Sequence, residues 1–190
     1  MGREFELKYR ADGACFAHIQ AAYGPFTPIT METAYYDAPD GALRSRFWTL
    51  RRRLENGVSV CTVKTPASGG ARGEWEVACD HLEDAIPMLV ERGAPEELIA
   101  FTKNGIEQTC AARFTRLAAT VTLEGCTVEL ALDQGVLLGG GNELPFAEVE
   151  VELKQGSEAL AVSFARILAQ RYGLTPEPRS KVQRALALAK

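Results

Sequence analysis

Two segments near opposite ends of the sequence alternate charged and apolar residues, and they constrain the fold more than any other feature. The first is Glu4-Phe5-Glu6-Leu7-Lys8, and the second is Glu148-Val149-Glu150-Val151-Glu152. In an extended strand, residues two apart share a face, so each segment has one apolar face and one face rich in carboxylates. Neighbouring carboxylates repel one another, so such a row either lies in open water or faces a counter-charge or a metal ion.

The composition is that of a globular protein able to bury a core. The 190 residues are 46% hydrophobic and 24% charged, and no repeat or linker divides them, so we expect a single domain over residues 1–190. The net charge of −4 argues against a nucleic-acid partner. The N-terminus has no apolar signal core, and no apolar run approaches the length of a membrane span. We therefore expect no membrane partner. The five cysteines are odd in number and include no CxxC pair, which favours a reduced, cytoplasmic protein.

Strand patterns dominate the chain, and helices separate them. Asn56-Gly57 joins two alternating segments and predicts a tight hairpin, so the sheet is expected to be antiparallel. The expected strands cover residues 3–10, 33–36, 49–54, 59–64, 72–79, 110–123, 127–133 and 146–154. The expected helices cover residues 12–22, 81–92, 96–101 and 157–172, and a last helix begins near residue 180.

Nearly every expected strand carries ionisable residues at a spacing of two. The further examples are Arg51-x-Arg53, Thr62-x-Lys64, Arg72-x-Glu74-x-Glu76, Arg113 with Arg116, and Glu129-x-Ala131-x-Asp133. One such strand is explained by a sheet face in water. Whole carboxylate rows beside whole cationic rows instead favour a closed barrel whose charged faces point inward and whose apolar faces lie under helices. Such a lumen suits a polyanion together with a hard divalent cation.

The order of these motifs resembles the CYTH superfamily, the triphosphate tunnel metalloenzymes, over essentially the whole chain. The first alternating segment is similar to that family's ExExK signature. Further motifs agree in order: Tyr35-Tyr36-Asp37, Leu43, Leu50-Arg51-Arg52-Arg53, Thr62-Val63-Lys64, Arg72-Gly73-Glu74-Trp75-Glu76, Glu129 to Asp133, Glu148-Val149-Glu150, and Ser180-Lys181 with Arg184. The resemblance implies an α+β fold, an eight-stranded antiparallel β-barrel that forms a tunnel with a charged lumen, with the helices packed outside.

The resemblance and the chemistry of the side chains together give an expected site. Carboxylates suit Mg2+ or Mn2+, and the expected metal ligands are Glu4, Glu6, Glu148, Glu150 and Glu152. Cationic side chains suit phosphate oxygens, and the expected substrate-binding residues are Lys8, Arg51, Arg53, Lys64, Arg113, Arg116, Lys181 and Arg184. The remaining acidic residues of the lumen are the expected catalytic residues, with general base among their roles: Glu74, Glu76, Glu129 and Asp133.

Two orientations stay open at this point. A regular strand places Arg113 and Arg116 on opposite faces, so the alternation does not say which of them faces the lumen. Lys181 and Arg184 lie three apart at the start of the last expected helix and therefore share a face. They either plug the tunnel or form a solvated basic helix end.

Other kinds of site have little support. His18 and His81 are in no metal-ligand spacing, which argues against a zinc site or a serine–histidine pair. Gly139-Gly140-Gly141 lacks a following Lys-Ser/Thr pair, so it predicts a hairpin turn and not a P-loop. Phe47, Trp48 and Trp75 either stack on a base or thiazole ring or pack in the outer core.

Three functions are compatible with these features. Residues 129–135 most resemble bacterial inorganic triphosphatases, some of which carry an additional C-terminal helical domain that we expect to be absent here. The favoured function is therefore metal-dependent hydrolysis of inorganic triphosphate to pyrophosphate and phosphate. The alternatives are hydrolysis of thiamine or nucleoside triphosphate, or class IV adenylyl cyclase activity, in the same tunnel, and a non-catalytic polyphosphate- or nucleotide-binding module. The sequence leaves a homodimer open.

Overall fold

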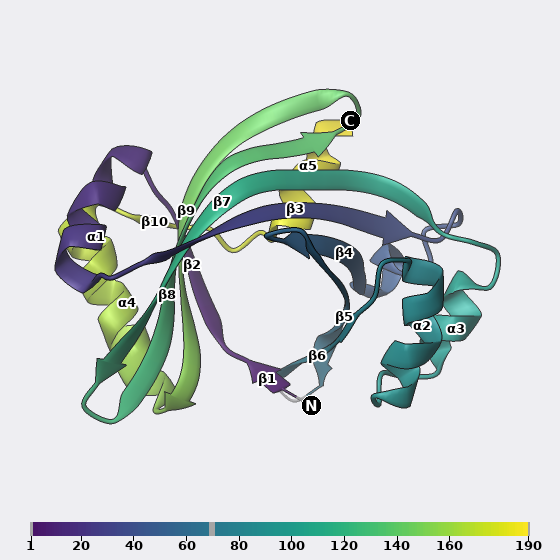
Figure 1. Ribbon diagram of the computed structural model, residues 1–190, viewed down its shortest axis with the longest axis horizontal. Coiled ribbons are helices and arrows are strands. Elements are labelled where there is room, and N and C mark those ends of the chain that lie inside the picture. Colours follow the sequence, from purple (N-terminus) through teal and green to yellow (C-terminus); the bar gives the residue numbers. More distant parts are fainter. Residues whose placement is uncertain (1, 69–70, 190) are drawn as a thin grey trace.

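A computed structural model describes residues 2–68 and 71–189 and shows an α+β fold built on one antiparallel sheet (Figure 1). The described residues form ten strands in the spatial order β1-β6-β5-β4-β3-β7-β8-β9-β2-β10. The strand bounds are β1 Gly2–Glu4, β2 Glu6–Arg10, β3 Thr27–Asp37, β4 Thr49–Glu55, β5 Val58–Ser68, β6 Ala71–Ala78, β7 Glu107–Leu123, β8 Cys126–Gly139, β9 Asn142–Gly156 and β10 Thr175–Pro176. The antiparallel sheet predicted from the sequence is confirmed.

The N-terminal segment closes the sheet on itself. Its first half, β1, pairs with β6 through Gly2 opposite Glu74, whereas its second half, β2, pairs with β9 through Glu6 opposite Glu152. Between the two halves, the carbonyl of Phe5 accepts a hydrogen bond of 2.9 Å from the amide of Leu153. Counting β1 and β2 as one interrupted strand, and leaving out the two-residue β10, gives the eight strands that the sequence predicts.

Alternation along each strand separates an apolar outer face from a charged inner face. On β8, Val128, Leu130 and Leu132 are completely buried in an apolar cluster outside the ring. The residues that alternate with them, including Glu129 and Asp133, therefore point to the inside. This arrangement confirms that the apolar faces are directed outward.

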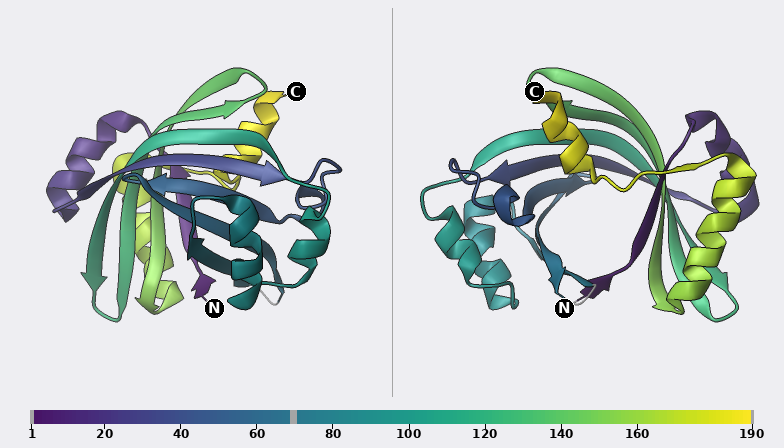
Figure 2. Two further views of the ribbon diagram at one scale, coloured as in Figure 1. Left: turned by 45° about the vertical axis from the view of Figure 1, so that its right-hand side comes forward. Right: turned by 180° about the vertical axis from the view of Figure 1, so that it is seen from behind.

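Four helices cover the outside of the sheet (Figure 2). The helices α1 (Phe16–Tyr23) and α4 (Glu158–Tyr172) contribute to the apolar cluster over β2, β8 and β9. On another part of the ring, α2 (Leu82–Glu91) and α3 (Glu97–Thr102) bury apolar residues against β4, β5 and β6. Across residues 2–68 and 71–189, the helices are all too short or too polar to cross a membrane.

The fifth helix, α5 (Lys181–Leu186), differs from the expectation that helices pack outside, because it lies against the inner face of the sheet (Figure 2). Its Ala185 is buried in a cluster with Phe114, Leu137 and Phe146. Ser180 begins the helix with a capping box: its hydroxyl accepts from the amide of Gln183, whose side chain in turn accepts from the amide of Ser180. The inner position of α5 places its first residues in the lumen.

The glycine-rich turn between β8 and β9 is the surface on which the C-terminal residues pack. A Cβ atom at Gly139 would lie 2.1 Å from the carbonyl oxygen of Ala185, and one at Gly140 would lie 2.4 Å from Cα of Ala189. In addition, the side chain of Asn142 donates a 2.9 Å hydrogen bond to the carbonyl of Leu188. The hairpin turn that the sequence predicts is present, and its glycines also allow α5 to approach the sheet closely.

The outer apolar face predicts a matched pair of stability changes. Leu130→Ala should lower the free energy of unfolding by about 2–5 kcal/mol, because it leaves a cavity between β8 and its helical cover. Leu160→Ala on α4, where the side chain is 41% exposed, should change it by less than about 0.5 kcal/mol. Urea denaturation of both variants would measure the difference, and equal losses would contradict this assignment of the core.

Candidate functional site

A cavity of about 1190 Å³ lies inside the ring of strands. Its lining combines acidic and basic side chains from both halves of the sheet with residues of α5 and of the segment before it. Most of the residues expected from the sequence line it: Glu6, Lys8, Arg51, Arg53, Lys64, Glu74, Glu76, Arg116, Glu129, Glu150, Glu152 and Lys181. Residues that are far apart in the sequence are therefore brought to one shared cavity.

Strand register sorts the charges on one side of the cavity into rows that cross β7, β8, β9 and β2. The row near α5 contains Arg116, Asp133, Glu148 and Arg10. The next row contains Ala118, Ala131, Glu150 and Lys8. The third row contains Thr120, Glu129, Glu152 and Glu6. We call Glu6, Glu129 and Glu152 the acidic row, because three carboxylates stand side by side in it.

The facing wall, made by β4, β5 and β6, carries cations held against carboxylates. Lys64 Nζ lies 3.1 Å from Glu74 and Arg51 Nη2 lies 3.5 Å from the same carboxylate. Arg53 Nη1 lies 2.8 Å from Glu55. Among the described residues, no hydrogen-bond partner reaches the buried Nε of Arg53. This wall therefore offers buried donor capacity to an anion in the cavity.

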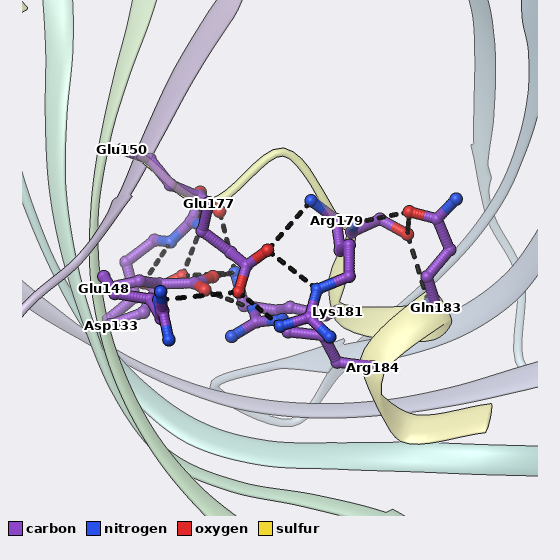
Figure 3. Close-up of polar contacts among 11 residues, drawn as sticks. Asp133, Glu148, Glu150, Glu177, Arg179, Lys181, Gln183 and Arg184 are labelled. Carbon is purple, nitrogen blue, oxygen red and sulfur yellow. Dashed lines mark hydrogen bonds and ion pairs between the residues drawn. The ribbon is translucent and has the colours of Figure 1, made fainter. Parts of the chain in front are cut away.

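Six charged residues at the α5 end form a buried charge cluster: Arg116, Asp133, Glu148, Glu150, Lys181 and Arg184 (Figure 3). Lys181 lies at its centre. Its Nζ is 2.8 Å from a carboxylate oxygen of Asp133, 2.8 Å from one of Glu150, and in contact with Glu148. The lysine expected at the start of the last helix thus reaches into the tunnel, which favours the plug over a solvated helix end.

Two arginines complete the buried charge cluster. Arg116 forms a bidentate pair with Asp133: its Nε lies 2.8 Å from Oδ1 and its Nη2 lies 2.7 Å from Oδ2. Arg116 also contacts Glu150. Arg184 contacts Glu148. Three carboxylates thus face three cations, and their formal charges cancel, which is the condition for burying them together.

Burial and ion pairing shift the pKa values in this cluster in opposite directions. Burial opposes ionisation of Glu150, but Lys181 and Arg116 outweigh it and hold the pKa of Glu150 well below its ordinary value. For Glu148, burial is the largest effect and raises the pKa. Burial would lower the pKa of Lys181, yet Glu150, Asp133 and Glu148 raise it above the ordinary lysine value. Lys181 is therefore a fixed positive charge at physiological pH.

Two aromatic rings on the inner face support the cations, and the sequence patterns did not identify them. Lys181 Nζ lies 5.0 Å from the ring centroid of Phe114 and 5.6 Å from that of Phe146. The guanidinium of Arg184 lies 5.4 Å from the Phe146 centroid. Because cations are attracted to aromatic faces at this range, the rings help to hold α5 in the lumen.

Two groups of carboxylates have the donor chemistry of a divalent-cation site. Asp133, Glu148 and Glu150, here called the acidic trio, each offer an oxygen, and these oxygens all lie within 4.8 Å of one another. The acidic row is the second group, and it lies farther from α5. Hard cations such as Mg2+ and Mn2+ prefer carboxylate oxygens, so the donor chemistry of both groups suits such an ion, and in the acidic trio the oxygens are also close together.

Several expected site residues do not line the cavity. Arg113 is exposed and lies on the outer face of β7, one residue from the inward Phe114, whereas Arg116 faces the lumen. This corrects the expected substrate-binding role of Arg113. Asp133, Glu148 and Arg184 are buried behind the cavity lining. The side chain of Glu4 is outside the described residues.

Two further charged features of the site were not predicted from the sequence. Lys154 lies 2.7 Å from Glu152 and 3.8 Å from Glu129, and it continues the alternation of β9, so that pattern could have identified it. The buried Glu177 accepts from Arg179 in the segment between β10 and α5, and its amide donates to the carbonyl of Lys8. The sequence around Glu177 has no periodicity that would have revealed this contact.

Comparison with known proteins agrees with this fold. The family described as the CYTH domain matches residues 2–186. An inorganic triphosphatase from Haemophilus influenzae is 26% identical over 195 residues, which cover 99% of this chain and 55% of that protein. The chain thus spans about half the length of this curated relative.

Solved structures show the same fold. A putative adenylyl cyclase from Hippeastrum, reported to have a dominant triphosphatase activity, superposes with a TM-score of 0.69 at 17% identity, covering 98% of this chain and 96% of that one. A putative adenylate cyclase from Bacillus halodurans gives a TM-score of 0.64 at 18% identity, with 97% and 98% coverage. The resemblance inferred from the motifs is confirmed.

The contact between Glu177 and Arg179 predicts a pH-dependent contribution to stability. The hydrogen bond from Arg179 lowers the pKa of Glu177 from 4.5 to about 2. A carboxylate with a depressed pKa in the folded state stabilises the fold above its unfolded pKa and loses that contribution as the pH falls through the folded value. Glu177→Gln should therefore be less stable than wild type by about 1 kcal/mol at pH 7, and the gap should narrow between about pH 4.5 and 2.

Unfolding free energies measured across this pH range would test the contribution of Glu177. The exposed Glu143 on β9 provides a control, and Glu143→Gln should follow the wild-type curve. A gap between Glu177→Gln and wild type that stays constant down to pH 2 would contradict the assignment.

Proposed function

This chain belongs to the CYTH family, and on that premise we propose that it is a divalent-metal-dependent triphosphatase that hydrolyses inorganic triphosphate to pyrophosphate and phosphate. The observation that carries the proposal is the charged cavity inside the ring, in which cations on one wall face the acidic row on the other. A triphosphate with bound metal matches this distribution, because its oxygens need cations and its metal needs carboxylates.

The cations on the cavity surface are the proposed phosphate ligands. Lys8 and Arg116 approach from the side of the acidic row, and Arg51, Arg53 and Lys64 approach from the opposite wall. The buried Nε of Arg53, which has no hydrogen-bond partner among the described residues, supports this role. The side chains of Arg51, Arg53 and Lys64 are largely withdrawn from water, and such cations attract phosphate oxygens more strongly than fully hydrated ones do.

The carboxylates are the proposed metal ligands. Glu6 and Glu152 of the acidic row, together with Glu150 at the cavity surface, have suitable donor atoms, and Glu4 remains a proposal from the sequence pattern. A bound Mg2+ or Mn2+ would withdraw negative charge from the phosphate oxygens during transfer.

Hydrolysis of the terminal phosphoryl group requires a water molecule in line with the leaving pyrophosphate. The water oxygen forms a bond to phosphorus as the bridging P–O bond breaks, and the bond's electrons leave with pyrophosphate. A carboxylate of the cavity surface, Glu76 or Glu129, takes up the proton from water. Asp133 is not suited to that role, because both of its oxygens are bonded to Arg116 and it is fully buried.

One observation favours a second candidate, an organic triphosphate as substrate. Phe47 lines the cavity, yet its side chain is 74% exposed, and its backbone is left-handed with φ of 60°. Asp37 holds the preceding loop by accepting from the amides of Ala38 and Leu43. An exposed aromatic ring at a phosphate-binding cavity could stack on a base or thiazole ring.

A substrate comparison separates these candidates. With Mg2+ or Mn2+, the purified protein should hydrolyse inorganic triphosphate with a higher kcat/KM than ATP or thiamine triphosphate, releasing phosphate and pyrophosphate without cyclic AMP. Removal of the metal with a chelator should abolish turnover. Faster turnover of an organic triphosphate would favour the second candidate, and no hydrolysis of any substrate would refute the enzyme assignment.

Two glutamate substitutions test the role of the acidic row. Glu6→Gln keeps the size of the side chain but removes a negative donor, so activity at limiting metal should fall at least about 100-fold. Glu32→Gln is the matched control, since Glu32 is exposed on β3 opposite the outward Arg113, and it should change activity by less than about twofold. Equal activities of the two variants would contradict the metal assignment.

A further inference from the structure

We propose that Lys181 is an internal counter-cation of the acidic trio, which it leaves when a divalent metal ion binds there, and that its ammonium group then binds the triphosphate. This inference rests on the proposed function and adds a coupling mechanism to it: metal and anion binding become linked through one side chain. Its support comes from the position of Lys181, from the charge balance of the trio and from the way α5 is attached.

The position of Lys181 gives its ammonium access to both partners. Nζ contacts all three carboxylates of the acidic trio, and the same side chain lines the cavity in which a triphosphate would lie. Arg184 also contacts the trio, but it does not line the cavity. Lys181 is therefore the cation of α5 that can exchange a carboxylate contact for a phosphate contact.

The charge balance makes Lys181 a competitor of a metal ion. With Lys181, Arg116 and Arg184 in place, the three negative charges of the trio are already neutralised. A divalent cation among the same oxygens would add like charge within a few ångströms of the ammonium, so the two cations repel each other. Removal of the ammonium from the trio relieves this repulsion.

The attachment of α5 allows such an exchange without movement of the helix. Ser180 and Gln183 cap the helix, and Ala185 packs against Gly139 at the other end. The Lys181 ammonium is carried by four rotatable methylene groups, whereas Arg116 is fixed by two hydrogen bonds to Asp133. Rotation of one lysine side chain is sufficient to carry the charge from the trio to the cavity.

Metal binding in the absence of any phosphate is the primary test. Titration calorimetry with Mn2+ should show that Lys181→Met binds the ion about 10-fold more tightly than wild type, because the competing cation is gone. Arg53→Met is the matched control, since it also removes one cation from the tunnel but from the opposite wall, and it should bind Mn2+ within about twofold of wild type.

Anion binding gives a second readout with the opposite sign. With the non-hydrolysable analogue diimidotriphosphate, Lys181→Met should lose about 10-fold in affinity at saturating Mn2+ but less than about threefold without metal, where Lys181 of the wild type is held by the trio. Arg53→Met should weaken anion binding under both conditions. If Lys181 served only to stabilise the fold, the effect of its substitution on anion affinity would be the same with and without metal.

A measurement on the wild-type protein covers the case in which Lys181→Met does not fold. Acylation of lysines followed by mass spectrometry should show faster modification of Lys181 with Mn2+ than without it. Unchanged modification, or Mn2+ affinity of folded Lys181→Met no tighter than wild type, would overturn the exchange. Failure of the wild type to hydrolyse any triphosphate would instead refute the proposed function, and the metal titrations would remain interpretable.

Discussion

A charge removed from water is stable only when other charges and hydrogen bonds replace its hydration, and the rest of the architecture depends on meeting that condition inside the ring. Three carboxylates of β8 and β9 meet Arg116 from β7 and two cations from α5. Because α5 supplies two of the three positive charges, it has to lie inside while the other four helices cover the apolar outside. The inner position of α5 and the inward direction of the charged sheet face thus follow from one electrostatic requirement.

The sequence predicted those parts of the site that depend on local geometry. A period of two fixes which residues of a strand share a face. The apolar residues that alternate with Glu129, Glu150 and Glu152 marked the opposite face as the one under the helices, so the inward direction of these carboxylates was predicted. The same rule left Arg113 and Arg116 ambiguous, because it separates the two faces without saying which is inner. Their assignment came from tertiary packing, in which Phe114 and Arg116 share the lumen. Alternation is equally silent on depth, and Asp133 was therefore expected at the cavity surface although it lies behind it.

Other features depend on partners that no local pattern identifies. The turn glycines were recognised as a turn, but their contact with Ala185 and Ala189 joins segments distant in the sequence. Glu177 lies between two prolines and has no alternating neighbours, so no local pattern predicts its burial. The burial results from the pairing of β10 with β2. In the sequence, Phe114 and Phe146 look like ordinary strand residues. Their role depends on α5, which places the cations of Lys181 and Arg184 over their rings. Lys154 is the exception, since it continues an alternation already identified.

The closure of the sheet by residues 2–10 has a consequence for biosynthesis. These residues are synthesised well before β9, yet β2 pairs with β9. A contact between such distant segments carries a large loop-closure cost and forms late. Until then, the edge of β9 that will receive β2 stays unpaired, and the carboxylate of Glu6 is not yet beside Glu152. The acidic row is therefore completed in the same step that closes the ring. A nascent chain in which β9 has not yet been made has no complete acidic row.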